Sequence, residues 1–209
     1  MRAARDLGRT ALLCLVGGSA DAIAFLRYGT FVGAMTGNTV LLGIDVAAGH
    51  FEKAVYHLAI IAAFLVAVIL TRTALDYRLS VLVPLGLTAI MLGTSGLIAS
   101  QWGAALSAAA LGMQNAAVRR IGGVSVNTVF ITGDLVRLGV AVPEAGAPGQ
   151  HPEVVLLATA WIAYAIGAIV GGVALHLIFY PMILPAALAA LAACVETMAQ
   201  RRNAARPAK

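Results

Sequence analysis

Charged residues are scarce in this chain of 209 residues. Only 11% are Asp, Glu, Lys or Arg, 61% are hydrophobic, and the mean hydropathy is +0.92. A soluble globular protein has about 25% charged and about 45–50% apolar residues. A soluble fold of this size would lack the polar residues to cover its surface, so the composition excludes a soluble enzyme, a disordered chain and a secreted disulfide scaffold. It indicates an integral membrane protein made mostly of helices.

Several motifs that carry chemistry are also missing. The two cysteines, Cys14 and Cys194, lie in apolar runs without CxxC or Cys/His spacing, so we expect no structural zinc site. The four histidines form no HExxH pattern, and no serine lies in a GxSxG turn. The sequence therefore predicts no metal, no cofactor and no enzyme.

Long apolar runs make up most of the chain. A spanning helix needs about 20 mostly apolar residues, and four runs qualify: residues 54–71, 80–99, 154–175 and 178–199. Two further regions, 9–48 and 103–142, are each about 40 residues long. As one straight helix each would reach about 60 Å, twice the hydrocarbon core. Each must therefore break, fold back or cross twice.

Both long regions contain a visible interruption. Residues 27–35 and 119–131 are rich in glycine and β-branched residues, which weaken a helix. Thr36-Gly37-Asn38 and Thr132-Gly133-Asp134 follow as expected helix starts, because Thr is a good N-cap and a short polar side chain can accept free amide hydrogens. The pattern leaves open whether the interruptions are extended breaks, re-entrant loops or turns between crossings.

Lys and Arg lie mainly at the two ends of the chain, which in a membrane protein indicates topology rather than nucleic-acid binding. If each long region is one discontinuous crossing, six crossings place nine Lys or Arg on one side and one on the other. Eight crossings give a weaker split of eight against five. We therefore predict six crossings, with the N-terminus and the basic tail 201–209 in the cytoplasm. The first apolar run continues past Asp21, so we expect an uncleaved helix.

The two long regions resemble each other. Residues 35–43 align with residues 131–139 at a constant offset of 96, and Asp21 aligns with Asn115 across a two-residue gap. The single transmembrane domain, 1–209, thus divides into halves 1–100 and 101–200, each an interrupted element followed by two plain helices. With three crossings each, the halves insert in opposite orientations, as in many secondary transporters. Chance recurrence of small residues at helix-packing positions is the alternative.

Several motifs resemble those of the YoaK-like family of small bacterial membrane proteins. They are Asp21-Ala22-x-x-Phe25-Leu26, Phe31-Val32-x-Ala34-Met35-Thr36-Gly37-Asn38-Thr39-Val40, Gly112-Met113-Gln114-Asn115-Ala116-x-x-Arg119-Arg120 and Ile131-Thr132-Gly133-Asp134-Leu135. The resemblance implies a multi-pass protein of the bacterial inner membrane and no particular activity, because the family is of unknown function. Asp134 departs from the small or hydroxyl residue that the family pattern favours there.

Polar residues within the expected membrane region fall almost wholly in the two interrupted elements. A charge inside a bilayer costs about 2.5–3.5 kcal/mol on insertion scales, so such residues usually serve a site or a pair. The candidate binding residues are Asp21, Thr36, Gly37, Asn38, Gln114, Asn115, Arg119, Arg120, Thr132, Gly133, Asp134 and Arg137.

Most of these residues also have a structural interpretation. Asp21 carries a proton or a cation, or it pairs with Arg119 or Arg120. The two helix starts bind an anion through free amides, or they are packed kinks without a ligand. Asp134 would compete with such an anion, and Arg137, three residues on, can pair with it. Arg119 and Arg120 either bind substrate or reach the interface with their charged ends.

These features together predict a transporter or channel for a small polar solute or ion, with its site between the two interrupted elements. Its expected partners are the lipid bilayer, that solute and a second copy of the chain. A non-transporting scaffold or accessory subunit is the main alternative, and an intramembrane lipid-modifying enzyme is a weaker one. A packed midplane favours the scaffold, a polar cavity closed to lipid favours transport, and a cavity open to lipid favours the enzyme.

Overall fold

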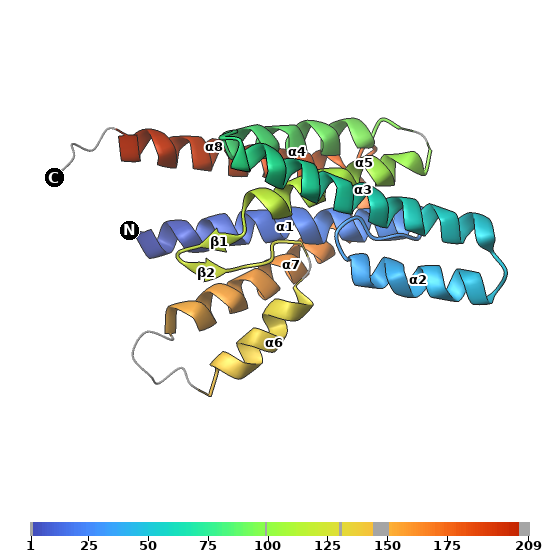
Figure 1. The fold of residues 1–209 in the computed structure, drawn as a ribbon, viewed down its shortest axis with the longest axis horizontal. Coiled ribbons are helices and arrows are strands. Elements are labelled where there is room, and N and C mark those ends of the chain that lie inside the picture. The colour runs from blue at the N-terminus through green and yellow to red at the C-terminus, as the bar shows by residue number, and fades with distance from the viewer. Residues whose placement is uncertain (1, 99, 130, 144–150, 205–209) are drawn as a thin grey trace.

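The computed structural model describes residues 2–98, 100–129, 131–143 and 151–204. Helices dominate these residues, as the sequence predicts (Figure 1). In chain order they are α1 (Arg2–Tyr28), α2 (Met35–Ala47), α3 (Phe51–Asp76), α4 (Leu82–Ser95), α5 (Trp102–Ala117), α6 (Thr132–Ala141), α7 (His151–Leu177) and α8 (Ile183–Ala204). A short antiparallel hairpin of β1 (Arg120–Ile121) and β2 (Val124–Ser125) lies between α5 and α6.

Three of these helices are long and apolar enough to cross a membrane. They are α1 from Ala3, α3, and α7 from Pro152, while α4 and most of α8 are shorter apolar helices. Large apolar side chains such as Leu70 and Ile169 are about two-thirds exposed, which fits a surface that faces lipid. The chain is therefore a helical membrane protein. The predicted cytoplasmic loop at 143–153 and the basic tail at 201–209 fall largely outside the described residues.

Both long regions are interrupted where the sequence predicts it. α1 ends at Tyr28, Gly29 follows with a φ of 67°, and α2 begins at Met35. The second interruption is longer and contains the β-hairpin, an element that the sequence analysis did not predict. Gly122 and Gly123 form its two-residue turn with φ values of 59° and 86°. Positive φ at both turn positions is typical of tight hairpins and is readily adopted by glycine.

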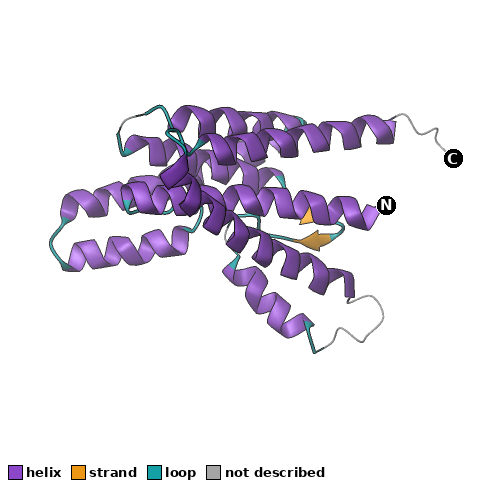
Figure 2. Cartoon of the chain, turned by 180° about the vertical axis from the view of Figure 1, so that it is seen from behind, coloured by secondary structure: helices purple, strands orange, loops and turns teal. Residues whose placement is uncertain are grey.

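The two interrupted regions run in opposite directions through the bundle. α1 leads from the end that holds both termini to the opposite end, as the two views show (Figures 1 and 2). α5 runs the other way and delivers the hairpin to the first turns of α1, where a Cβ on Gly122 would lie 3.1 Å from Asp6 Oδ2. α2 continues in the direction of α1, and α6 continues in the direction of α5 (Figure 1). Each region is thus a helix, a short return and a second helix in the same direction.

The helices pack in matched pairs. α1 lies against α7 along most of its length, and α5 lies against α3. α1 also packs on α8, and α5 on α4. α2 lies along α3 and α6 along α7, while α4 and α8 pack on each other. If α1, α2, α3 and α4 are matched with α5, α6, α7 and α8, each packed pair in one half corresponds to a packed pair in the other. The pair of α4 with α8 corresponds to itself.

Glycines allow the closest helix crossings. Where α1 meets α7, a Cβ added to Gly18 would lie against the backbone carbonyl oxygen of Tyr164. Where α5 meets α3, a Cβ on Gly112 would lie 2.5 Å from the carbonyl oxygen of Phe64. Small residues bring backbones together in membrane helix pairs, where packing rather than the hydrophobic effect drives association.

Gly18→Ala is expected to destabilise the protein by about 1–3 kcal/mol, because α1 and α7 must separate to make room for a methyl group. The measurement is the thermal unfolding midpoint of the detergent-purified protein. Gly43→Ala is the matched control: an added Cβ there meets nothing within 4 Å and improves helix propensity. Equal midpoints for the two variants would contradict the close crossing.

Candidate functional site

The two interruptions meet in the core of the bundle. Gly33 of the first lies so close to Val129 of the second that a Cβ on Gly33 would collide with Val129 Cγ1. The same Cβ would lie 3.0 Å from Asp21 Oδ2 and 3.2 Å from Leu111 of α5. Val32 and Val129 are fully buried. The contact between the breaks is therefore tightly packed and apolar, with a carboxylate at its edge.

Asp21 holds the first break in place. Its side chain is 2% exposed, and Oδ1 accepts hydrogen bonds from the backbone amides of Val32 and Gly33, both at 2.7 Å. Oδ2 accepts a hydrogen bond of 2.5 Å from the hydroxyl of Tyr164 on α7. Of the two alternatives for Asp21, the ion pair with Arg119 or Arg120 is not formed, because amides and a phenol satisfy the carboxylate instead.

Asn38 and Asp134 play matching parts in the two breaks. Asn38 Oδ1 accepts a hydrogen bond of 2.9 Å from the amide of Phe31, and Asp134 Oδ2 accepts one of 2.7 Å from the amide of Asn127. In both breaks the donor lies seven residues before the acceptor. Asn38 also donates to the carbonyl oxygen of Phe31 at 2.7 Å, so both sides of this backbone are satisfied. These two buried side chains close the breaks onto the helices that follow.

The expected threonine caps are absent from both helix starts. α2 and α6 are preceded by Ala34 and Ile131 at the N-cap position, and neither end has a side-chain cap. Thr36 is the second residue of α2, and Thr132 is the first residue of α6. Both side chains are exposed. The threonine prediction was wrong because the breaks take their hydrogen bonds from residues two positions further on.

The glycines of the two triplets face the breaks. A Cβ on Gly37 would lie 2.7 Å from the ring of Phe31, and one on Gly133 would lie 3.9 Å from Nδ2 of Asn127. The glycines thus face the same two residues whose amides Asn38 and Asp134 bind. At Gly37 the missing side chain makes room for an aromatic ring, so this glycine serves packing.

Asp134 forms the predicted pair with Arg137. The two side chains are 3.6 Å apart, and Arg137 also binds Glu153 of α7 at 2.5 Å and the carbonyl oxygen of Ser125. Asp134 is fully buried, whereas Arg137 is partly exposed. This network connects α6 to the hairpin and to α7. Its two carboxylates, on Asp134 and Glu153, neutralise the charge of Arg137.

Gln114 connects the second break to α1. Its Nε2 donates hydrogen bonds to the carbonyl oxygen of Leu13 at 3.0 Å and to Oγ1 of Thr128 at 3.2 Å. Its Oε1 is buried without a hydrogen-bond partner. Asn115, the next residue, is half-buried. Of the two, Gln114 is the residue that positions the break.

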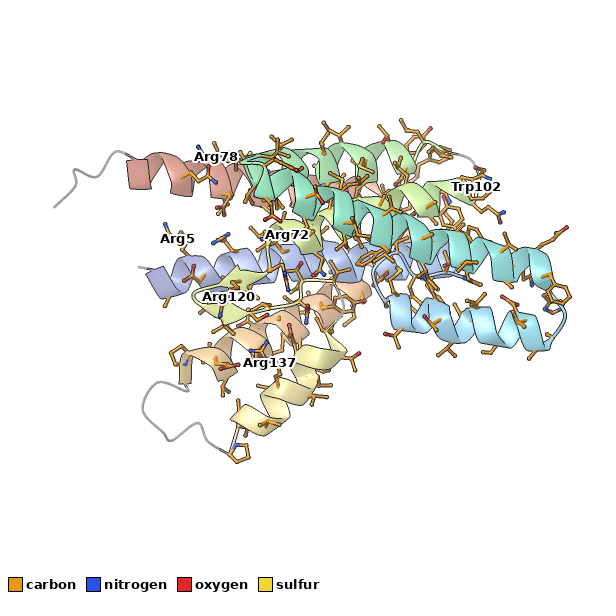
Figure 3. The ribbon with its side chains drawn as sticks, viewed as in Figure 1. Arg5, Arg72, Arg78, Trp102, Arg120 and Arg137 are labelled. Carbon is orange, nitrogen blue, oxygen red and sulfur yellow. The ribbon has the colours of Figure 1, made fainter. Side chains whose placement is uncertain are left out.

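Arg119 and Arg120 begin the second break, and the hairpin places them away from the contact of Gly33 with Val129. Both are exposed on the hairpin that reaches the first turns of α1. Figure 3 shows Arg120 toward the end of the bundle that holds Arg5 and Arg78, with Trp102 toward the opposite end. Their exposed positions fit the interpretation of the two arginines as interfacial residues.

Four residues at the site were missed by sequence reasoning. The contact of Tyr164 with Asp21 joins positions 143 residues apart. Thr30, Asp45 and His57 form a second polar network beside the first break. The only sequence signal was the presence of a histidine in a plain apolar helix.

A groove of about 480 Å³ lies between α3, α4 and α5, away from the breaks. Its lining is almost entirely apolar and includes Val66, Leu70, Leu87, Met91 and Met113. Val66, Leu70 and Leu87 are exposed, so the groove opens toward lipid. It lacks the polar groups that a site for a small polar solute needs.

Tyr164→Phe is expected to lower stability by about 1–3 kcal/mol, because Asp21 Oδ2 loses a buried donor. The thermal unfolding midpoint in detergent measures the loss. Tyr180→Phe is the matched control, since the Tyr180 side chain is 48% exposed. A Tyr164→Phe protein as stable as the control would show that this hydrogen bond contributes nothing.

Comparison with known proteins adds a family but no activity. Neither a search of curated proteins nor a search of solved structures found a significant match. The family described as "Protein of unknown function (DUF1275)" matches residues 10–195, which includes both breaks and every candidate site residue. This family assignment names no function, and no named relative confirms the resemblance to the YoaK-like family. The chain belongs to the DUF1275 family of proteins of unknown function.

Proposed function

We propose that this protein transports a small polar solute across the bacterial inner membrane, with its site at the two breaks. The observation that carries the proposal is the pair of interrupted helices whose breaks abut at Gly33 and Val129 beside the buried Asp21. Interrupted helices at a repeat interface form the binding sites of many secondary transporters. A buried ionisable residue in a membrane helix is costly and usually functional.

An inverted repeat of α1–α4 and α5–α8 is part of this proposal. Its support is the exchange of helix pairs and the opposite direction of α1 and α5 (Figure 1). In both halves a glycine lies against a backbone carbonyl oxygen of the partner helix: Gly18 against that of Tyr164, and Gly112 against that of Phe64. Gly33 and Val129, which touch, are related by the same offset of 96 as the sequence repeat. A twofold axis through this contact would relate the halves.

Six crossings with both termini in the cytoplasm remain the proposed topology. Arg5, Arg78 and Arg120 lie toward the end of the bundle that holds both termini (Figure 3). Arg27 and Lys53 belong to the opposite end, at the end of α1 and the start of α3. This excess of arginine at one end follows the rule that positive residues stay inside.

The proposed solute is a cation or a neutral polar molecule rather than an anion. An anion would need the amides that the breaks set free. The chain's own side chains take these amides: Asp21 binds those of Val32 and Gly33, and Asp134 binds that of Asn127. Neither Asp21 oxygen has a cationic partner among the described contacts. A solute that donates hydrogen bonds or carries positive charge would replace Tyr164 or the amides at this carboxylate.

Transport through this site requires the halves to move apart at the breaks. The packed contact of Gly33 with Val129 leaves no room for a solute, so it represents a closed arrangement. In alternating access, one repeat rocks against the other around a fixed site. The hydrogen bonds of Asp21 to the break and to α7 would then open on one side at a time.

The second candidate function is that of a non-transporting accessory subunit. The same packed contact supports it, together with the self-paired Asp134, Arg137 and Glu153 network. In that case the polar residues serve only to stabilise the two breaks. A flux measurement separates the two functions.

Asp21→Asn is expected to reduce solute flux about tenfold or more, because a hydrogen bond to a charged group is worth about 1.5–3 kcal/mol in binding. The measurement is flux in proteoliposomes across a panel of small cations, neutral polar solutes and small anions, with and without a proton gradient. Asp76→Asn is the matched control, since Asp76 is exposed at the end of α3 and pairs only with Arg72 in the described structure.

Flux of a cation or neutral solute that Asp21→Asn abolishes and Asp76→Asn leaves intact would support transport at the breaks. Equal flux in both variants would remove the site, and flux of anions alone would contradict the proposed solute class. No flux from folded protein over the whole panel would overturn the transport proposal in favour of the accessory subunit.

A further inference from the structure

A line of polar side chains leads from one end of the bundle to the first break. His50, whose side chain is 57% exposed, lies 3.5 Å from Asp45 near the end of α2. The other oxygen of Asp45 lies 3.2 Å from Nε2 of His57, a residue that is 5% exposed on α3. Nδ1 of His57 is 3.2 Å from the hydroxyl of Thr30, which is fully buried in the break. The line therefore connects an exposed histidine to a buried one.

The line continues from Thr30 into the backbone of the break. Thr30 Oγ1 is 3.0 Å from Asn38 Oδ1, and this same oxygen accepts the amide hydrogen of Phe31. Asn38 is the residue that closes the first break onto α2. Any change in the hydrogen bonds of Thr30 therefore reaches the break directly.

A count of hydrogens shows that this network has two forms. The Thr30 hydroxyl has a single hydrogen, so it can donate to Asn38 or to His57 but not to both. With neutral His57, Nε2–H donates to the Asp45 carboxylate and Nδ1 accepts from Thr30. With protonated His57, both ring nitrogens are donors, and the hydrogen of Thr30 is free to turn to Asn38 Oδ1.

We infer that His57, held at Nε2 by the Asp45 carboxylate, is a proton-binding site that reports its protonation to the first break through Thr30 and Asn38. The inference deepens the proposed transport function by naming the coupling ion, and it rests on that function only for the consequence of proton binding. The incoming proton adds to Nδ1 of His57. No other covalent bond is made or broken: Nε2–H stays on Asp45, and the proton is released again from Nδ1.

The groups around His57 suit it to hold an exchangeable proton. Burial of the ring favours its neutral form, whereas Asp45 of α2 faces it and favours the imidazolium by charge. Lys53 and Tyr56 lie on α3 itself, and Tyr28 ends α1 near Tyr56. α5, which packs along α3, has no titratable residue in its sequence. His57 is thus linked to one acid, and histidine is the side chain that changes charge near neutral pH.

The second half lacks this arrangement. The positions that match Thr30, Asp45 and His57 hold Val126, Ala141 and Leu157, at offsets of 96, 96 and 100. The second break is held instead by the ion pair of Asp134 with Arg137 and by Glu153. Proton binding would therefore act on the first break only, from the part of the bundle where α2 ends and α3 begins (Figure 1).

The first test measures the protonation of His57 directly and does not depend on transport. The full chain with ¹⁵N-labelled histidine is placed in lipid nanodiscs, and ring nitrogen shifts are recorded between about pH 5 and pH 9, where histidines titrate. We expect His57 to change from the neutral form with hydrogen on Nε2 to the imidazolium. A His57 that keeps one protonation state throughout, or a neutral form with hydrogen on Nδ1, would overturn the inference.

Variants show whether Thr30 takes part. Thr30→Val should change the His57 Nδ1 shift, and Thr30→Ser should restore it, because serine keeps the hydroxyl. Thr94→Val is the matched control, since Thr94 is exposed on α4 and bonds only to carbonyls of its own helix in the described structure. A Thr30→Val spectrum identical to that of Thr94→Val would contradict the link to the break.

The second test measures proton entry with a pH-sensitive dye inside proteoliposomes under an imposed pH gradient. His57→Gln and Asp45→Asn should reduce proton flux to the level of empty liposomes, while Asp76→Asn should not. A titrating His57 with unchanged proton flux in these variants would overturn proton coupling through His57 but leave solute transport standing. Loss of solute flux in Asp21→Asn alone would test the proposed function separately.

Discussion

A backbone amide or carbonyl inside a lipid bilayer must find its partner within the protein, and this constraint organises the whole structure. An uninterrupted helix meets it by itself. The two breaks do not, because they free peptide groups inside the bundle, such as the buried amides of Val32 and Gly33. The buried residues Asp21, Asn38 and Asp134 supply what the helices no longer provide. Their cost in the membrane is offset by the hydrogen bonds that they accept.

The breaks in turn determine how the helices around them pack. Asp21 joins the first break to α7 through Tyr164, and Gln114 joins the second break to α1. These links need helix backbones that approach closely, which Gly18 and Gly112 allow. The hydrogen bonds of the buried polar side chains therefore depend on close helix packing, and they stabilise that packing in turn. Membrane helices lack a hydrophobic drive toward each other, so both contributions are needed.

The two halves satisfy the same constraint with different chemistry. In the first half the break is held by neutral and acidic groups, with His57 and Asp45 behind them. In the second half an arginine lies between two carboxylates, Asp134 and Glu153.

The sequence by itself determined the membrane class, the positions of the plain helices and the places where the two long regions break. Composition and apolar run length suffice for these, since they reflect the thickness and polarity of the bilayer. It also identified Asp21, Asn38 and Asp134 as polar residues that need a reason. The pairing of Asp134 with Arg137 was predictable from helix spacing, because it is local.

Only the tertiary structure decided the partners of these residues. Tyr164 reaches Asp21 from 143 residues away, and no periodicity in the sequence reports such a contact. The threonines at positions 36 and 132 look like caps, yet they are exposed because Asn38 and Asp134 already serve the breaks. Arg119 and Arg120 lie between other candidate site residues in sequence, but the hairpin carries them to the end of the bundle. Local patterns determine where a helix can start and stop, whereas the choice of hydrogen-bond partner depends on which elements the packing of glycines brings together.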